Sequence, residues 1–149
     1  MKNIGVIGLG DMGSGIALNL IKNGFKVFGS DLLPERQQAF KNMGGSLEIS
    51  IADIGKKCDA VFVMVMNGSQ AKSIIFDEDG LARNMEAGST VILSATIKPS
   101  EAEEIGHLIK DTGLQFIDTP VSGGFPGAQS GTLTPVSYTH LTLPTKWWV

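Results

Sequence analysis

The residues best suited to binding chemistry lie near the start of the chain, in the segment Gly8–Gly13, which reads GLGDMG. This segment fits the pattern G-x-G-x-x-G, follows an apolar run directly and precedes residues that repeat at helical spacing. In such a setting the first glycine makes a tight turn, the second lets a diphosphate approach the backbone, and the third lets the helix pack against the strand. The N–H groups that open the helix would face the phosphates. The pattern predicts a dinucleotide site, although a glycine-rich turn that binds nothing would look the same locally.

Asp31 is the acidic partner that this glycine motif requires. It ends a second apolar run and lies roughly 20 positions beyond the glycines, where such a residue binds the adenosine ribose. A carboxylate accepts hydrogen bonds from a ribose 2′-hydroxyl and repels a 2′-phosphate, so we predict NAD in preference to NADP. Two alternatives stay open: Asp31 also suits a surface turn before Pro34, and Arg36 is close enough in sequence to accept a 2′-phosphate.

Polar residues also follow three later apolar runs, and in doubly wound sheets ligands bind beyond the carboxyl ends of the strands. The Thr96 hydroxyl could lie near a nicotinamide ribose. Ser122, with the backbone N–H groups of Gly123 and Gly124, could hold a carboxylate, because successive amides in a glycine turn bind anions. A turn that leads into a helix would explain Thr96 equally well, and a plain strand-to-helix turn would explain Ser122.

The spacing of apolar residues alternates between strand and helix periods, and this alternation defines the elements that must position these residues. Strands are predicted at Ile4–Ile7, Lys26–Ser30, Ala60–Met66, Thr90–Ala95 and Leu114–Ile117. Helices are predicted to begin near Met12, Pro34, Ser50, Ser69 and Ser100, the third and fifth with a serine-to-acid capping pattern. Alternating strands and helices predict an α/β fold with a doubly wound, Rossmann-type parallel sheet.

Composition and charge narrow the class of protein. The 149 residues suffice for one domain, and they are 42% hydrophobic with a net charge of −3, which leaves no basic surface for nucleic acid or an anionic membrane. The single cysteine, Cys58, excludes an internal disulfide, and the first apolar run is too short for a secretory signal. Neither His107 nor His140 has neighbours at metal-ligand spacing, so no metal site is expected. We expect a soluble, cytoplasmic protein.

Two segments make the sequence recognisable: "IGVIGLGDMGSGIALNLIKNG" and "IDTPVSGGFPGAQSGTLT". Together they resemble the 3-hydroxyisobutyrate dehydrogenase family, the β-hydroxyacid dehydrogenases, over Met1 to about Thr134. Within this family "VMVMNGSQAKSIIF" and "ILSATIKPSEAEE" are more similar to the L-threonate dehydrogenase branch. The resemblance implies reversible NAD-dependent oxidation of a hydroxyl group in a small hydroxy acid.

The resemblance also implies roles for individual residues. The adenosine and diphosphate would be bound by Gly8, Leu9, Gly10, Met12, Gly13 and Asp31. Met66 and Thr96 would approach the nicotinamide side, and Ser122, Gly123 and Gly124 would hold the substrate carboxylate.

The general acid/base that the resemblance implies is a lysine in a G-x-x-x-K-x-x-N pattern, on a helix of a second domain that closes the site and carries dimer contacts. A lysine suits this role because partial burial and nearby charge can bring its pKa toward neutrality. The sequence lacks this pattern, since the only lysine or arginine after Thr134 is Lys146. We therefore expect no catalytic residue in this chain. Residues 1–134 are expected to form an NAD-binding domain that is truncated near its sixth strand. This domain would bind NAD without turnover. The full-length protein is expected to be a homo-oligomer.

Residues 135–149 differ from the family, which continues after "GTLT" with an apolar strand. The ending "VSYTHLTLPTKWWV" resembles translated cloning sequence, so we expect residues 135–149 to be non-native or disordered. A genuine short extension anchored by Trp147 and Trp148 is the alternative. Two other functions also stay open: a stand-alone dinucleotide-binding module without catalysis, and an NADP-dependent semialdehyde or glyoxylate reductase.

Overall fold

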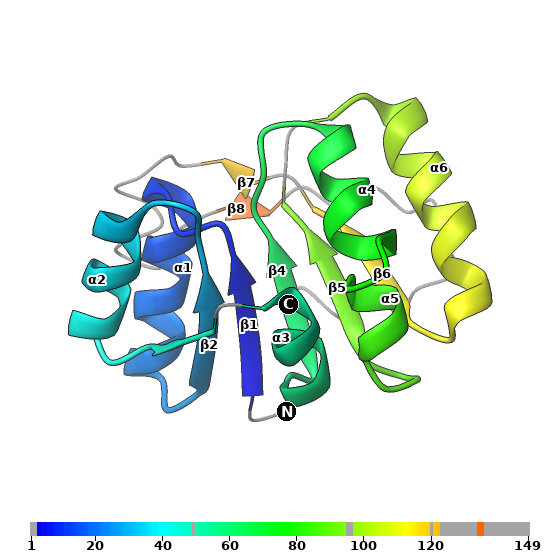
Figure 1. The fold of residues 1–149 in the computed structure, drawn as a ribbon. Helices are drawn as coiled ribbons and strands as arrows, with labels where there is room; N and C mark the ends of the chain where they lie inside the picture. The colour runs from blue at the N-terminus through cyan, green and yellow to red at the C-terminus, as the bar shows by residue number, and fades with distance from the viewer. Residues whose placement is uncertain (1–2, 49, 95–96, 120, 123–133, 136–149) are drawn as a thin grey trace.

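Six parallel strands form the central sheet in the computed structural model of the chain, which describes residues 3–48, 50–94, 97–119, 121–122 and 134–135 (Figure 1). The strands are β1 (Asn3–Ile7), β2 (Lys26–Ser30), β3 (Ser46–Leu47), β4 (Ala60–Val63), β5 (Thr90–Leu93) and β6 (Gln115–Asp118). Their order across the sheet is β3-β2-β1-β4-β5-β6, with every neighbouring pair parallel. A separate antiparallel pair joins β7 (Val121–Ser122) to β8 (Thr134–Pro135). The predicted doubly wound α/β fold is confirmed.

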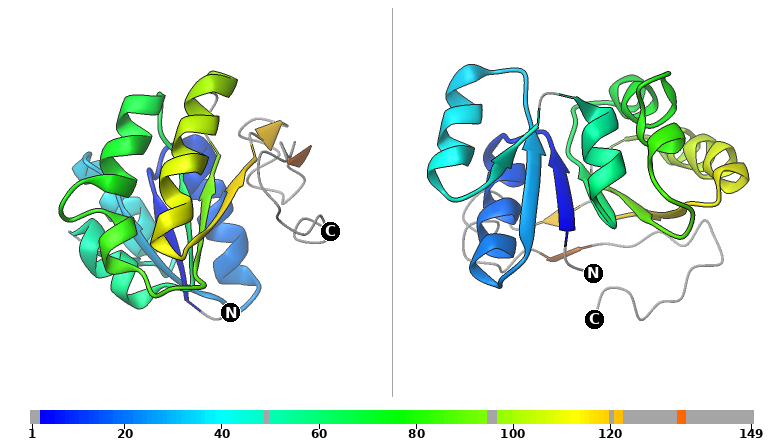
Figure 2. Two further views of the ribbon diagram at one scale, coloured as in Figure 1. Left: turned by 90° about the vertical axis from the view of Figure 1, so that its right-hand side faces the viewer. Right: turned by 60° about the horizontal axis from the view of Figure 1, so that its bottom comes forward.

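Helices cover both faces of the sheet, as parallel crossovers require. They are α1 (Asp11–Lys22), α2 (Pro34–Asn42), α3 (Ile51–Lys57), α4 (Gly68–Phe76), α5 (Leu81–Asn84) and α6 (Pro99–Ile109), the last followed by a 3₁₀ turn at Lys110–Thr112. In the left-hand view of Figure 2 the sheet lies between α1 on one side and α4 and α6 on the other. The strands β2 and β3 are added on one side of β1 and the strands β4 to β6 on the other, so the pair β1 and β4 marks the topological switch point.

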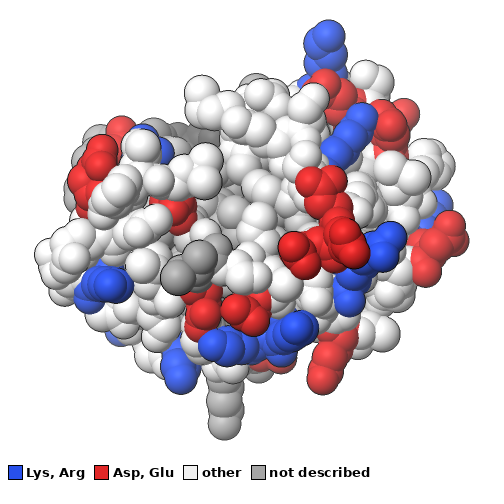
Figure 3. Space-filling model, in the orientation of Figure 1, with Lys and Arg blue, Asp and Glu red and all other residues white. Residues whose placement is uncertain are grey.

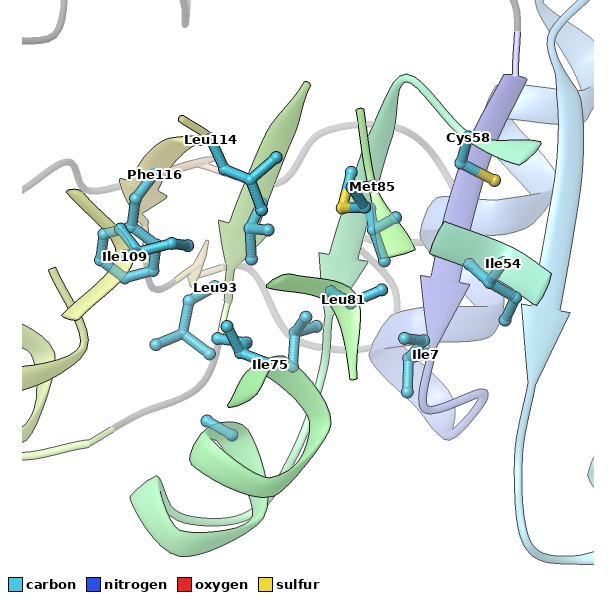
Figure 4. Packing of buried hydrophobic residues seen from close by; sticks show 14 of the residues in the cluster. Ile7, Ile54, Cys58, Ile75, Leu81, Met85, Leu93, Ile109, Leu114 and Phe116 are labelled. Carbon is cyan, nitrogen blue, oxygen red and sulfur yellow. The ribbon is translucent and has the colours of Figure 1, made fainter. Parts of the chain in front are cut away.

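Two apolar cores lie on the two faces. The larger one fills the side of α3 to α6, and its side chains include Ile54, Ile75, Leu81, Leu93, Ile109 and Phe116 (Figure 4). The smaller one lies under α1 and α2 and is built around Val6, Leu9, Ala17, Val27 and Phe40. Strands with buried residues on both faces explain the continuous apolar runs of the sequence.

Phe40 shows how tightly the smaller core is packed. Its ring is 1% exposed. A Cβ atom added at Gly29 would lie 2.7 Å from the ring, and one added at Gly45 would overlap it. The edge of the sheet at β2 and β3 therefore closes around one aromatic side chain that two glycines accommodate.

Some predicted elements were correct in their details and others were wrong. Ser50 caps α3 as predicted, because its hydroxyl accepts a hydrogen bond from the Asp53 backbone N–H at 3.4 Å. The prediction of a cap at Ser100 was wrong: α6 begins at Pro99, and Lys98 is the residue before the helix. Proline favours the first helical position, since its missing N–H is not needed there.

The short elements β3, α5, β7 and β8 were not predicted, and the strands β4 and β5 end earlier than predicted. β3 and α5 have two and four residues, too few for a period to show. β4 ends at Val63 rather than at Met66. Beyond it the Met66 backbone N–H bonds to the Gln70 side chain, at 2.8 Å, and Asn67 caps α4. Met64 itself still bonds to the sheet, because its backbone N–H donates to the Ile7 carbonyl oxygen at 2.8 Å. The bonds at Met66 and Asn67 lead the chain from there into α4.

On the surface shown in Figure 3, acidic and basic side chains are interspersed. Two ion pairs tie neighbouring elements together: Lys57 and Glu48 lie 2.5 Å apart, and Lys72 and Glu104, on α4 and α6, lie 2.7 Å apart. Exposed pairs of this kind contribute little stability. Within the described residues no helix is long and apolar enough to cross a bilayer. The same residues contain no cluster of three potential metal ligands.

Candidate dinucleotide-binding site

The candidate site lies at the carboxyl edge of the sheet, where β1 and β4 are neighbours. The turn after β1 leads into α1 on one face, and the turn after β4 leads into α4 on the other face. Connections that leave a strand pair in opposite directions open a crevice at its carboxyl end, which is the usual ligand position in this fold. The glycine motif Gly8–Gly13 directly follows β1 and therefore lies at this end of the sheet.

Gly8 and Gly13 are required by the packing of the turn. Gly8 has φ +96°, a conformation that favours glycine, and a Cβ atom there would overlap the carbonyl oxygen of Met64. A Cβ atom at Gly13 would overlap the carbonyl oxygen of Gly8. The turn is thus pressed between β4 and α1, and these two glycines serve close packing of the backbone.

Gly10 differs from both, because a Cβ atom added there would overlap nothing among the described residues. Its nearest described neighbours would be atoms of the Arg36 guanidinium group, in ordinary van der Waals contact at 3.7–3.8 Å. Gly10 is the residue that precedes α1, and none of the described side chains caps this helix start. The N–H groups of the first turn therefore have no partner within the helix, and they carry the positive end of its dipole. An open backbone above a free helix start fits a diphosphate group.

Asp31 is bound to the glycine turn itself. Its Oδ2 atom accepts a hydrogen bond from the Leu9 backbone N–H at 2.7 Å, and its Oδ1 atom accepts one from the Leu33 N–H at 2.9 Å. The Asp31 side chain is only 7% exposed. The predicted closeness of Asp31 to the turn is therefore present, and the carboxylate also has a structural role: it fastens the end of β2 to the turn after β1.

Arg36 lies beside this carboxylate, on the first turn of α2. Its Nη1 atom is 3.6 Å from Asp31 Oδ2, and its side chain is 47% exposed. The Cζ, Nη1 and Nη2 atoms are nearly equidistant from the Cβ position of Gly10, so the guanidinium plane faces the glycine turn. The positively charged Arg36 side chain therefore lies next to both Asp31 and the glycine turn.

The other predicted site residues are described to different extents. Leu9 is buried and its backbone N–H donates to Asp31, Met12 is partly buried in α1, and Met66 follows β4 with 84% of its surface exposed. The backbone of Ser122 pairs with Thr134 in β7 and β8. Thr96, Gly123 and Gly124 lie outside the described residues, so the predicted nicotinamide and carboxylate contacts stay predictions.

Three further residues at this edge were not assigned a role from the sequence. Leu32, directly after Asp31, is 95% exposed, which is unusual for a leucine. Ser94 and Thr119 follow β5 and β6, are buried, and have hydroxyl groups without a hydrogen-bond partner among the described residues. Ser94 and Thr119 lie at or just after the ends of predicted strands, but burial of a hydroxyl group without a partner becomes visible only in three dimensions.

The fold and the glycine turn together define a dinucleotide-binding domain of the Rossmann class. Residues 3–137 match the model of the NAD binding domain of 6-phosphogluconate dehydrogenase, and the chain belongs to this family.

Three named proteins show what the chain is similar to. It is 44% identical to L-threonate dehydrogenase of Cupriavidus necator over 133 residues, which are 89% of this chain and 45% of that protein. It is 36% identical to the mitochondrial 3-hydroxyisobutyrate dehydrogenase of Rattus norvegicus, over 88% of this chain and 39% of the relative. The crystal structure of 3-hydroxyisobutyrate dehydrogenase from Salmonella typhimurium superposes with a TM-score of 0.86 at 32% identity, covering 92% of this chain and 48% of the other. The chain spans less than half the length of these dehydrogenases and corresponds to their NAD-binding half.

Proposed function

We propose that the chain is the NAD-binding half of a dehydrogenase that oxidises a hydroxyl group of a small hydroxy acid, with L-threonate and 3-hydroxyisobutyrate as candidate substrates. The observation that carries this proposal is the glycine turn clasped by Asp31 at the switch point of the sheet. The 44% identity to an L-threonate dehydrogenase favours the first substrate.

The residues of this chain would hold the cofactor at two places, its diphosphate and its adenosine ribose. The free N–H groups at the start of α1, next to Gly10, suit the diphosphate. Asp31 Oδ2 already accepts a hydrogen bond from the Leu9 N–H. The adenosine ribose hydroxyl would therefore donate to Oδ1, which accepts from the Leu33 N–H and can accept a further hydrogen bond. Bound NAD would accept a hydride from the carbon atom that carries the substrate hydroxyl group.

On the substrate side we propose the predicted roles of the remaining residues. Met66 and Thr96 would lie along the nicotinamide, and Ser122, Gly123 and Gly124 would hold the carboxylate. The hydroxyl proton must pass to a base, and we assign this base to a lysine of the second domain implied by the family resemblance. The 149-residue chain is then expected to bind NAD and to show no turnover, because proton transfer and exclusion of water both depend on that domain.

We further propose that the full-length protein is a cytoplasmic homo-oligomer. The single, buried Cys58 supports a reducing compartment. The mitochondrial relative of Rattus norvegicus makes an organelle the alternative. Light scattering on the full-length protein and fractionation of the source cells test these two points separately.

A chimaera tests the proposed substrate class. The chain replaces the matching 133 residues of the Cupriavidus necator enzyme, and NADH formation is followed with L-threonate, 3-hydroxyisobutyrate and glycerate. Oxidation of either of the first two supports the proposal. A chimaera that binds NAD but oxidises none of the three contradicts it. The matched control carries Gly10→Ala, which should keep the fold and weaken NAD binding.

The second candidate function, an NADP-dependent reductase, is favoured by one observation, the position of Arg36 beside Asp31. The same chimaera distinguishes the two functions. If the protein is an NADP-dependent reductase, the chimaera should reduce a semialdehyde or glyoxylate with NADPH faster than it oxidises a hydroxy acid with NAD.

A further inference from the structure

We infer that Asp31 and Arg36 act as a pair that admits a 2′-phosphate, so that the site binds NADP as well as NAD. This inference rests on the proposed dinucleotide site and deepens it. Asp31 considered alone predicts rejection of NADP, because a carboxylate repels a 2′-phosphate. The contacts around this carboxylate change that expectation.

The Asp31 carboxylate already has hydrogen-bond donors and a positive charge beside it in the absence of a ligand. Two backbone N–H groups, from Leu9 and Leu33, donate to its two oxygen atoms, at 2.7 and 2.9 Å. The Arg36 guanidinium adds a positive charge 3.6 Å from Oδ2. A carboxylate that is hydrogen-bonded by amides and faces a cation repels an approaching phosphate less than an unpartnered one does.

Arg36 is placed so that it can change partners. Its side chain is 47% exposed, and the distance of 3.6 Å to Asp31 is longer than that of a short charge-assisted hydrogen bond. The guanidinium plane faces Gly10, with its Cζ, Nη1 and Nη2 atoms 3.7–3.8 Å from the Cβ position of that glycine. A 2′-phosphate on the ribose next to Asp31 would meet these donors in the two-pronged geometry that arginine prefers for phosphate.

Loss of Arg36 from Asp31 would leave the turn intact. The clasp between β2 and the glycine turn is made by the Leu9 and Leu33 N–H groups, independently of the guanidinium. The Asp31 backbone is also held, since its carbonyl oxygen accepts a hydrogen bond from the Gln37 side chain at 2.7 Å. Arg36 is thus free to discriminate between cofactors without a cost to the fold.

Isothermal titration of the 149-residue chain with NAD and with NADP tests this inference. We expect the two dissociation constants of the unmodified chain to agree within about tenfold. Arg36→Gln should weaken NADP binding by about tenfold or more while changing NAD binding by less than about threefold. Arg36→Lys keeps the charge without the planar fork and should give an intermediate loss for NADP. Arg83→Gln removes the same charge from an exposed position on α5 and is the matched control.

The outcomes separate this inference from the site on which it rests. Rejection of NADP by more than about tenfold in the unmodified chain overturns the inference and leaves the NAD site standing. A parallel loss of NAD and NADP in Arg36→Gln also overturns it, since Arg36 would then contact a part common to both ligands. If neither ligand binds the folded, unmodified chain, the dinucleotide site itself is wrong and the inference falls with it.

Discussion

The carboxylate of Asp31 and the backbone N–H of Leu9 are joined by a hydrogen bond of 2.7 Å, which fastens the end of β2 to the turn after β1. The residue that sequence motifs assign to the cofactor therefore also maintains the shape of the glycine turn. A change at Asp31 should consequently affect stability and cofactor binding together.

Asp31→Ala removes the acceptor for two backbone N–H groups in a largely buried position. We expect the free energy of unfolding to fall by about 1–3 kcal/mol, the usual cost of leaving such donors without a partner. NAD affinity should fall by about tenfold or more through loss of the ribose contact. Asp31→Asn keeps one acceptor and should lose less stability. Urea unfolding and calorimetric titration measure the two effects, and an unchanged stability of Asp31→Ala would disprove the clasp.

Gly10→Ala should weaken NAD binding without loss of stability, whereas Gly13→Ala should lower stability. The Cβ atom at Gly10 meets only Arg36, at 3.7 Å, and the φ angle of −69° suits alanine. This variant should keep its fold and bind NAD poorly, because the methyl group occupies the diphosphate position. At Gly13 the Cβ atom overlaps the Gly8 carbonyl oxygen, so we expect a loss of about 2 kcal/mol or more in unfolding free energy. Equal stabilities of the two variants would contradict this division of roles.

Phe40→Ala should be among the most destabilising single changes. The ring is 1% exposed and fills the space between Gly29 and Gly45. Removal of a buried phenyl ring costs about 3–5 kcal/mol, through lost apolar burial and the cavity that remains. Phe40→Leu should cost less, because it fills part of the cavity. Chemical denaturation of both variants provides the test, and a loss below about 1 kcal/mol for alanine would show that the core relaxes around the site.

Asn67→Ala tests the cap of α4 at the carboxyl end of β4. The Asn67 Oδ1 atom accepts a hydrogen bond from the Gln70 backbone N–H at 2.9 Å. Loss of such a cap lowers stability by about 1 kcal/mol, whereas Asn67→Asp keeps an acceptor and should preserve it. Thermal melts of the two variants measure the difference. Identical melting temperatures for alanine and aspartate would show that the cap contributes nothing.

Cys58 predicts a pH dependence of stability. Burial raises the pKa of its thiol from 9.0 to about 12, with smaller contributions from the nearby acidic residues Asp59 and Glu48. Between these values the unfolded chain releases the thiol proton and the folded chain retains it. The contribution of the buried, protonated thiol to the free energy of unfolding is therefore complete below pH 9 and declines as pH rises toward 12. In urea titrations across this range the unmodified chain should lose more stability than Cys58→Ala; equal losses would show that the thiol does not contribute.

The sequence predicts that Cys58 is a single, reduced cysteine. Its burial in the structure predicts how slowly the thiol reacts. The thiol is 4% exposed and protonated at neutral pH. We expect iodoacetamide to modify it slowly in the folded chain and rapidly in urea, because only the exposed thiolate reacts.

The amino-acid sequence by itself determined the α/β class, the parallel sheet and the glycine turn. These features depend on local period and on glycine spacing, both of which are written in consecutive residues. The capping of α3 by Ser50 is equally local, and it was predicted correctly. The short elements β3 and α5 were missed because so few residues carry no period of their own.

Only the tertiary structure decided what each residue of the turn does. Gly8 and Gly13 pack against Met64 and against each other, whereas a Cβ atom at Gly10 would make only ordinary contact with the nearest described residue, Arg36. Asp31 fastens the turn, and Arg36, five positions later, joins it at the mouth of the site. The physical reason is that these distances depend on how β1, β2 and β4 align in the sheet, which is set by packing over long sequence separations and not by any local pattern.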